Sequence, residues 1–278
     1  MQNTNSTQHP GYLVAFKGLA CAWFKTLLLT LTFLNLGQVL HAQPWSYDFG
    51  TGTGTHSSGA STSFFTGTPS GTYRVRVGSG SGSLALVNPG TSLGTLSELQ
   101  IQSATSASAN KFGVYDWASP SNVAYLKTKF RTTSTGNGSL VFVLGLNTTA
   151  SDNNGYTNHY NNSLGMVRIT YASGAISAVE RRISGSFSAI SSSGFAKDTD
   201  HLIEIYANNS GSSTTYTRGG SNTLATRTWD LWVDGVQVVS NAPRAGTLAA
   251  GNLNGFTFFA ESSTGNAAYI YLDDLEIS

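Results

Sequence analysis

The clearest pattern of apolar and polar positions in this chain surrounds Asp234 and Gly235. Two apolar runs, Thr228–Val233 and Val236–Val239, flank this Asp-Gly pair. A two-residue type I′ turn needs positive φ at both central positions, and Asp-Gly is typical of such turns. The pattern therefore predicts a β-hairpin with its turn at these two residues.

The turn also predicts the register of the hairpin. Val233 is expected to pair with Val236, and Leu231 with Val238. Because side chains alternate along a strand, one register assigns every side chain to a face. The predicted core face holds Trp229, Leu231, Val233, Val236 and Val238, and the other face holds Asp230, Trp232 and Gln237.

Short runs of the same kind recur through the chain, with turn residues between them and no helical period after the first 42 residues. They are Trp45–Phe49, Thr72–Val77, Leu84–Val87, Glu98–Ile101, Phe112–Tyr115, Ala124–Arg131, Leu140–Leu144, Met166–Tyr171, Ile176–Ile183, His201–Tyr206, Gly255–Ala260 and Tyr269–Ile277. Leu140–Leu144 is apolar on both faces, as in a central strand that is covered twice. The pattern predicts an all-β chain that folds as a two-sheet antiparallel β-sandwich or jelly roll.

Composition agrees with this prediction, because the chain is 10% charged and holds 31 glycines, whereas average proteins are about 25% charged. Residues 1–42 look like a secretory signal: Lys17 and Lys25 are positive, Thr26–Leu36 is the apolar centre, and Ala42 offers a cleavage site. About 11 apolar residues are too few to cross a bilayer, which needs about 20. We expect a secreted or cell-surface protein whose residues 43–278 form a single domain.

Cleavage would leave 278 − 42 = 236 residues and remove Cys21, the one cysteine. The remaining chain excludes thiol catalysis and cysteine-bound zinc. It has 15 − 2 = 13 basic and 14 acidic residues, a net charge of −1. This balance favours neither nucleic acid nor a membrane surface as a partner, and we expect no membrane insertion after cleavage.

Four segments of the second half resemble the concanavalin A-like, laminin G-like jelly roll. They are His201–Asn209, Trp229–Val239, Phe256–Ala260 and Tyr269–Ile277. The chain also resembles modules in large secreted proteins of Bacteroidetes-type bacteria. The resemblance implies the fold and leaves the function open, because the fold carries lectins, glycosidases, lyases and adhesion modules.

Enzymes with the fold that this chain resembles have sequence motifs that the chain lacks. The family 16 glycoside hydrolases of this fold have paired carboxylates on alternate positions of one strand, as Glu-x-Asp-x-Glu, and the nearest position here is the lone Glu204. The alginate-lyase-like members have Arg-x-Glu-Leu-Arg, whereas Val179–Arg182 has similar residues in another order. A non-catalytic module is therefore favoured over a glycoside hydrolase or polysaccharide lyase.

A carbohydrate site needs aromatic faces and planar hydrogen-bonding groups. Residues 147–162 supply these types, and two tryptophans elsewhere add aromatic faces. The candidate ligand-binding residues are Trp117, Asp152, Asn154, Tyr156, His159, Tyr160 and Trp232. The sequence thus predicts a polysaccharide-binding module. A structural or adhesion module stays open, because asparagine and glycine also fill loops for turn geometry alone, and Trp232 could simply pack under loops.

A second candidate is the basic ladder of Lys127, Lys129 and Arg131, which share one strand face. Such a ladder could bind an anionic glycan. The other interpretation is a solvated outer face that discourages pairing at a sheet edge.

The last candidate is a metal site at the two ends of the sandwich. Asp48 lies near the first predicted strand, and Asp273 and Asp274 lie in the last. Pairing of the terminal strands would bring these carboxylates together, and Ca²⁺ takes several oxygen ligands. The resemblance also implies a structural calcium near the chain ends, so we expect Ca²⁺ there.

Overall fold

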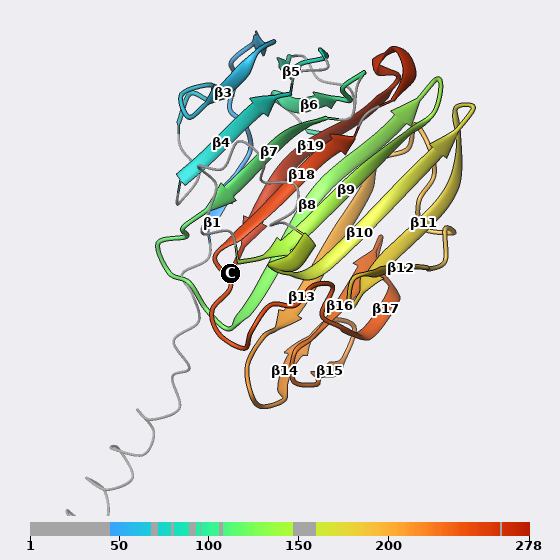
Figure 1. Cartoon of the computed structure of the whole chain (residues 1–278). Coiled ribbons are helices and arrows are strands. Elements are labelled where there is room, and N and C mark those ends of the chain that lie inside the picture. Colours follow the sequence, from blue (N-terminus) through green and yellow to red (C-terminus); the bar gives the residue numbers. More distant parts are fainter. Residues whose placement is uncertain are drawn as a thin grey trace, which may run out of the picture. The chain divides into compact units, whose positions relative to one another are not determined.

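The computed structural model describes residues 45–67, 72–78, 81–88, 93–94, 96–105, 108–146, 160–261 and 263–278. Two antiparallel sheets contain most of the strands (Figure 1). Sheet A has the order β17 (Val236–Pro243), β16 (Thr228–Val233), β13 (His201–Asn208), β8 (Val123–Ser134), β19 (Ala268–Ile277), β6 (Glu98–Gln102), β5 (Leu84–Val87) and β2 (Gly54–His56), with β1 (Trp45–Tyr47) also paired to β19. The predicted signal segment lies outside the described ranges.

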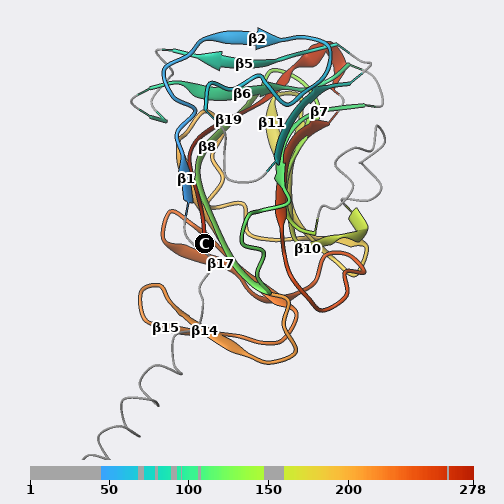
Figure 2. The same cartoon turned by 90° about the vertical axis from the view of Figure 1, so that its left-hand side faces the viewer.

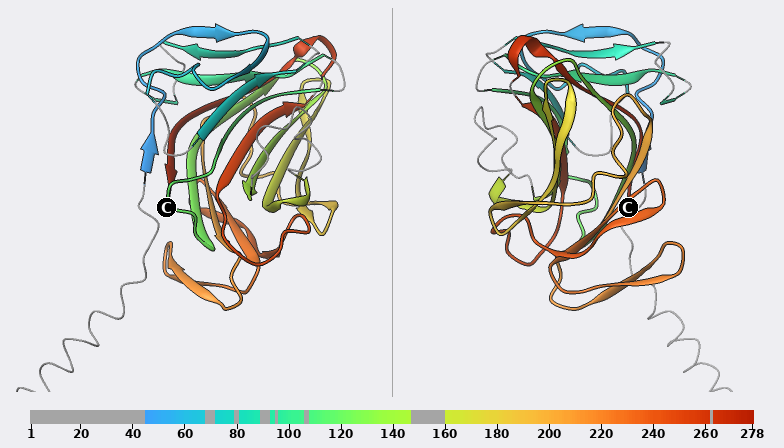
Figure 3. Two further views of the ribbon diagram at one scale, coloured as in Figure 1. Left: turned by 60° about the vertical axis from the view of Figure 1, so that its left-hand side comes forward. Right: turned by 90° about the vertical axis from the view of Figure 1, so that its right-hand side faces the viewer.

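Sheet B has the order β12 (Ser186–Ala189), β11 (Ala175–Ile183), β10 (Ser163–Ala172), β9 (Gly138–Gly145), β18 (Gly255–Glu261), β7 (Ala109–Tyr115), β4 (Thr72–Val77) and β3 (Gly59–Ser61). A separate ribbon of β14 (Thr214–Thr217) and β15 (Ser221–Leu224) lies at one end of the sandwich (Figure 3). Within the described ranges, a short 3₁₀ turn at Thr264–Asn266 and the helical residues Tyr160 and Asn161 accompany the strands. No helix in these ranges is long and apolar enough to cross a membrane.

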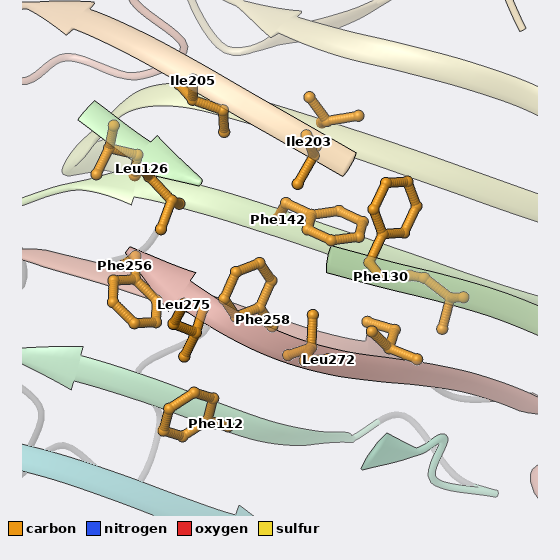
Figure 4. Close-up of a cluster of buried hydrophobic side chains, with 14 of the residues drawn as sticks. Phe112, Leu126, Phe130, Phe142, Ile203, Ile205, Phe256, Phe258, Leu272 and Leu275 are labelled. Atoms are coloured by element: carbon orange, nitrogen blue, oxygen red, sulfur yellow. The ribbon is translucent and has the colours of Figure 1, made fainter. Parts of the chain in front are cut away.

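The two sheets lie face to face as layers (Figure 2), which confirms the predicted two-sheet antiparallel sandwich of the jelly-roll type. The side chains between the layers come from alternate positions of both sheets. Figure 4 shows Phe130 and Leu272 of sheet A among Phe142, Phe256 and Phe258 of sheet B, all fully or almost fully buried. This single core is what the alternating sequence pattern encodes.

Strand β9 is buried on both faces, as its continuous apolar sequence predicts. Leu140, Phe142 and Leu144 belong to the core between the sheets. Val141 and Val143 point the other way, and they belong to a second, smaller cluster on the outer face of sheet B. An apolar patch on an outer face needs its own cover, and its surroundings are described below.

The central hairpin confirms one half of the predicted register and corrects the other. Val233 pairs with Val236 around the turn, as expected, but Leu231 pairs with Val239 and not with Val238. Val239 is buried, whereas Val236 is 63% exposed. The cause is a β-bulge, in which one extra residue on β17 shifts the pairing by one position.

The pairing shifts a second time between Trp229 and Leu231, and the carboxylate of Asp230 bonds to residues on both sides of this irregular segment. Its Oδ1 accepts the backbone N–H of Asn241 at 2.6 Å, and its Oδ2 accepts from Gln237 Nε2 at 2.8 Å. Asn241 has a positive φ of 45°, which asparagine tolerates better than most residues. The buried carboxylate of Asp230 thus accepts the backbone N–H of Asn241, which lies where the ladder of backbone hydrogen bonds is interrupted.

The first and last strands lie side by side, as predicted. Tyr47 pairs with Leu275 and Trp45 with Ile277. On its other edge β19 follows β8 up to Asp273 and resumes one residue out of step at Glu276. Asp274 has a φ of 48° at this irregularity. The bulge therefore lies where the two candidate aspartates of β19 are.

Candidate functional site

The outer face of sheet B carries most of the chemistry that the fold brings together. Neighbouring strands place side chains in rows across the sheet, because antiparallel partners lie directly opposite each other. One row contains Arg76, Lys111, Phe259, Val141, Arg168 and Glu180, in this order from β4 to β11. The next row contains Arg74, Gly113, Thr257, Val143 and Met166.

Cations outnumber carboxylates among the outward-facing residues of β4, β7, β18, β10 and β11. The cations are Arg74, Arg76, Lys111, Arg168 and Arg182, and the carboxylates are Glu180 and Glu261. The difference, 5 − 2, is an excess of three positive charges on one face of a chain whose described domain is close to neutral. Such an excess attracts anions to that face.

Arg168 is held in one orientation by its two neighbours. Its Nε and Nη2 both donate to Glu180 Oε2, at 2.8 and 2.7 Å, because the register places the two residues opposite each other. The Arg168 Cζ lies 3.5 Å from the centroid of the Phe187 ring. A guanidinium fixed by a carboxylate and an aromatic face is presented at little entropic cost to a ligand.

Tyr160 forms the adjacent part of this face. Its hydroxyl donates to Glu261 Oε1 at 3.0 Å, and its ring packs edge-on to Phe187 with centroids 6.1 Å apart. Arg182 stacks over the Tyr160 ring at 4.5 Å and also donates from Nη1 to the Tyr160 carbonyl. The five residues from Glu261 through Tyr160 and Arg182 to Phe187 and Arg168 form one connected aromatic and cationic surface, which we call the Tyr160 surface.

Burial controls the protonation of this surface. Burial raises the pKa of the Tyr160 hydroxyl, although Arg168 and Arg182 oppose the shift. It also raises the pKa of Glu261, against a hydrogen bond from Ser139. The phenol therefore stays protonated at neutral pH and acts as a hydrogen-bond donor. The hydroxyl and the ring of Tyr160 suit recognition by hydrogen bonding and stacking.

The structure separates the residues that the sequence predicts to form one carbohydrate site. Tyr160 lies on the outer face of sheet B, but Trp232 lies on the outer face of sheet A, on the other side of the core. Trp117 is 6% exposed and lies in the core, 6.4 Å from Phe256 between ring centroids. Its ring is covered by packing, so it offers no face to a ligand in this structure. Asp152, Asn154, Tyr156 and His159 lie outside the described residues.

Trp232 instead belongs to a network that anchors the β14–β15 ribbon. Its Nε1 donates to the Tyr216 hydroxyl at 2.8 Å, and that hydroxyl donates to Asp230 Oδ2 at 2.6 Å. The Tyr216 ring stacks on Tyr206 at 3.8 Å. Packing beneath another segment, the alternative left open by the sequence, is therefore what Trp232 does.

The basic ladder on sheet A is neutralised by its neighbours. Lys127 pairs with Glu276 at 2.8 Å and Lys129 with Asp274 at 2.6 Å. Arg131 pairs with both Glu98 and Asp200, at 3.1 and 2.8 Å. Each cation of the ladder has a carboxylate at contact distance, which favours the interpretation as a structural outer face over the anionic-glycan site.

The candidate metal ligands occupy separate roles. Asp48 Oδ1 accepts the backbone N–H of Gly50 at 3.0 Å, Asp274 is bound to Lys129, and Asp273 is 1% exposed. Burial raises the pKa of Asp273 to about 6. Among the described residues no three His, Cys, Asp or Glu side chains form a group suited to a metal ion. The calcium site thus stays a prediction.

Several residues of this face could not be singled out from the sequence. The alternation in Thr72–Val77 does place Arg74 and Arg76 on one face. Their neighbour Lys111 comes from a strand 34 residues away by numbering (111 − 77), so the grouping depends on sheet order. Glu261 and Arg182 meet at Tyr160 for the same reason.

No family model matches the chain, and no curated protein matches it. Similar solved structures include a variant of alginate lyase Aly36B in complex with an alginate trisaccharide, at 18% identity over 84% of this chain and 97% of that one, with a TM-score of 0.45. They also include the β-glucanase of Bacillus licheniformis (10% identity, 82% and 98% coverage, TM-score 0.42) and lectin I-B4 from Griffonia simplicifolia (12%, 65% and 87%, 0.35). At these identities and TM-scores the matches carry no argument about this chain.

Proposed function

We propose that this chain is a secreted, non-catalytic polysaccharide-binding module, and that the outer face of sheet B is its binding surface. The observation that carries the proposal is the Tyr160 surface, where two aromatic rings and two guanidinium groups come from β10, β11, β12 and the turn just before β10. Sugars bind to proteins through ring stacking and planar hydrogen-bonding groups, and both are concentrated there.

The internal bonds of this surface favour binding over catalysis. The Tyr160 hydroxyl is engaged with Glu261, and the Arg168 guanidinium with Glu180. Fixed donors of this kind give a rigid surface, and rigidity lowers the entropic cost of binding.

Affinity electrophoresis of the purified chain in gels that contain single polysaccharides tests this proposal. Phe187→Ala should weaken binding about tenfold, which corresponds to about 1.4 kcal/mol, since it removes one of the two rings. The matched control is Tyr269→Ala, which removes an outward-facing ring from sheet A and should leave retardation unchanged. Retardation by no polysaccharide at all would contradict the proposal.

Secretion is part of the same proposal and has its own test. The positive residues Lys17 and Lys25, the apolar centre and Ala42 support a cleaved signal. Mass spectrometry of exported protein should find an N-terminus at Gln43 or within a few residues of it. Recovery of protein with intact Met1 from the cytoplasm would contradict this part.

A further inference from the structure

Two arginines meet where the ladder between β16 and β17 ends. Thr228 and Pro243 form the last pair at this end of the ladder, so Arg227 and Arg244 are the next residues on the two chain segments. Arg227 Nη2 and Arg244 Nη1 both donate to the Leu248 carbonyl oxygen, the second at 2.6 Å. One acceptor therefore holds two positively charged guanidinium groups side by side. We call Arg227 and Arg244 the arginine pair.

Neither member of the arginine pair has a carboxylate partner within the part of the chain that the structure describes. The ion pairs found there belong to other cations. The Leu248 carbonyl is neutral, so it accepts one donor of each guanidinium and leaves both charges in place. A guanidinium has several N–H donors, and both side chains are half-buried. The arginine pair thus keeps its charge and further donors at the surface.

The conformation of Arg227 is unfavourable in two respects. Its φ of 59° lies in the left-handed region, where a residue other than glycine is strained. Its Nε is buried and has no hydrogen-bond partner among the described residues. Strain and unsatisfied polar groups lower stability, and they are concentrated at binding and catalytic sites. Both features therefore point to a binding role for Arg227.

The loop of residues 244–248 connects the arginine pair to the Tyr160 surface. Its Gly246 N–H donates to the Ser163 carbonyl at 2.9 Å. A Cβ built at Gly246 would collide with the Tyr160 carbonyl oxygen, so this close approach requires glycine. Arg244 is two residues from Gly246, a Cα distance of at most about 7.6 Å. The arginine pair and the Tyr160 ring are therefore neighbours on one surface.

A third guanidinium meets the same carbonyl. Arg182 Nη1 donates to the Tyr160 carbonyl oxygen that Gly246 approaches, and its Cζ lies 4.5 Å from the centroid of the Tyr160 ring. Burial lowers the pKa of Arg182, although Tyr160 opposes the shift. Such a shift is expected of a buried cation that no carboxylate stabilises. Three positive charges thus follow one another from the Tyr160 ring to the end of the β16–β17 ladder.

We propose that the arginine pair is a subsite for the acid groups of an acidic polysaccharide whose sugar rings lie on the Tyr160 surface. This inference rests on the proposed function and names the ligand class. Carboxylate and sulfate oxygens accept paired hydrogen bonds from guanidinium groups. An anion between the two arginines would also offset their mutual repulsion, which the neutral Leu248 carbonyl does only in part.

Binding of four polymers to the purified chain tests the ligand class. Polygalacturonate carries carboxylates, dextran sulfate carries sulfates, dextran is neutral, and single-stranded DNA is an unrelated polyanion. We expect one of the first two to bind about tenfold more tightly than dextran. Its affinity should fall as salt rises, because screening weakens the interaction of exposed charges.

Competition separates an acid group on a polymer from the same group as a free anion. The competitor is sodium galacturonate against polygalacturonate, or sodium sulfate against dextran sulfate. Displacement of the polymer should need a concentration of acid groups about 100-fold higher than the polymer supplies, because the sugar rings and further acid groups of the polymer bind together. Displacement at equal concentrations would overturn the assignment to a polysaccharide.

Two double variants of equal charge change locate the subsite. Arg227→Gln with Arg244→Gln should weaken binding of the preferred acidic polymer about tenfold and change dextran binding less than about twofold. Glutamine keeps an N–H donor for the Leu248 carbonyl. The control, Lys127→Gln with Lys129→Gln, removes the same charge from the outer face of sheet A and should change affinity less than about twofold.

The melting temperature separates a ligand-binding role from a structural one. The glutamine double variant should melt no lower than the original chain, because the repulsion between the arginines is removed with their charge. If it melts lower and loses dextran and acidic polymers alike, the arginine pair supports the loop alone and the proposal is overturned.

The remaining outcomes distinguish this inference from the function on which it rests. If dextran binds as tightly as the acidic polymers and the glutamine double variant binds all of them unchanged, the subsite is refuted but polysaccharide binding stands. If DNA binds as tightly as the acidic polysaccharides, the ligand class is refuted. If no polymer binds, both proposals fail.

Discussion

The outer faces of the two sheets contain similar residues in opposite arrangements. On sheet A each ladder cation meets a carboxylate, as in Lys127 with Glu276 and Lys129 with Asp274. On sheet B, Arg168 pairs with Glu180 in the same way, but Arg76 and Lys111 are register partners. Sheet A thus balances the charges of its ladder, whereas five cations and two carboxylates face outward on β4, β7, β18, β10 and β11 of sheet B.

This difference separates stability from recognition. Opposite charges at cross-strand positions stabilise a sheet slightly, whereas like charges destabilise it. A face that cancels its charges gains stability and offers little to a polyanion. A face that keeps an excess loses some stability and retains an electrostatic field that a ligand can use. Substitutions at particular residues of the two faces test this difference.

The largest effect is expected at Arg131 of sheet A. Its side chain is 9% exposed and contacts Glu98, which is 1% exposed, at 3.1 Å. Arg131→Met removes the charge that compensates a buried carboxylate, and such a loss costs about 3–5 kcal/mol. Urea unfolding should show this decrease in the free energy of unfolding, with Lys127→Met as a control that loses less than about 1 kcal/mol. Equal stability of Arg131→Met and the original chain would contradict this account of sheet A.

Asp273 should give the next largest effect, and it depends on pH. Burial raises its pKa from 3.8 to about 6, so the folded state binds its proton more tightly than the unfolded state does. Below about pH 4 both states are protonated and there is no penalty. As pH rises through 6 the folded state loses up to about 3 kcal/mol, at 1.36 kcal/mol per unit of pKa.

The variant Asp273→Asn has no such titration. Relative to the original chain it should match in stability near pH 4 and gain stability between pH 4 and 7, to at most about 3 kcal/mol. Urea unfolding at several pH values, expressed as the difference between the two proteins, isolates this group from other carboxylates. A difference that does not vary with pH would contradict the raised pKa.

Bound calcium, like protonation, would reduce the unfavourable free energy of keeping these carboxylates charged in the folded state. If Asp48, Asp273 and Asp274 bind Ca²⁺, the folded state should gain about 2.7 kcal/mol at a calcium concentration 100 times the Kd. Thermal melts in calcium and in chelator measure this gain, and Asp273→Asn should remove it. Equal melting temperatures in calcium and chelator would leave these residues as aspartates without a metal.

Much of the fold was predictable because apolar alternation determines which strands exist. Thr72–Val77 and Leu84–Val87 have the predicted bounds. The strands that the pattern missed, such as Gly54–His56 and Thr214–Thr217, are short and rich in Gly, Ser or Thr, and little of their surface is buried. Where packing contributes little, the apolar pattern that would reveal a strand is weak.

The site was less predictable because its residues meet through sheet order. Tyr160 was identified for its aromatic ring, but nothing local connects it with Glu261 or Phe187. Trp117 was misinterpreted because a tryptophan in a polar loop and one packed into the core look the same in sequence. Leu231 pairs with Val239, one residue beyond the predicted partner, where the carboxylate of Asp230 bonds to the backbone of Asn241. The alternation of apolar and polar residues does not reveal such a bond.

The smallest effect should come from making sheet A resemble sheet B. Asp274→Asn with Glu276→Gln removes the partners of Lys129 and Lys127, whose side chains are 44% and 28% exposed. Exposed pairs contribute little, so the free energy of unfolding should fall by about 1 kcal/mol or less. Asparagine also tolerates the positive φ of 48° at position 274.

The informative measurement is binding of polygalacturonate, an acidic polysaccharide, by this double variant. We expect its affinity to rise less than about threefold over the original chain. Lysine ammonium groups are mobile and strongly hydrated, and they lack the fork geometry of guanidinium groups held against aromatic rings. A rise of tenfold or more would show that excess charge is enough by itself. A small, salt-sensitive rise would show that recognition depends on how Arg168, Arg182 and Tyr160 are fixed on sheet B.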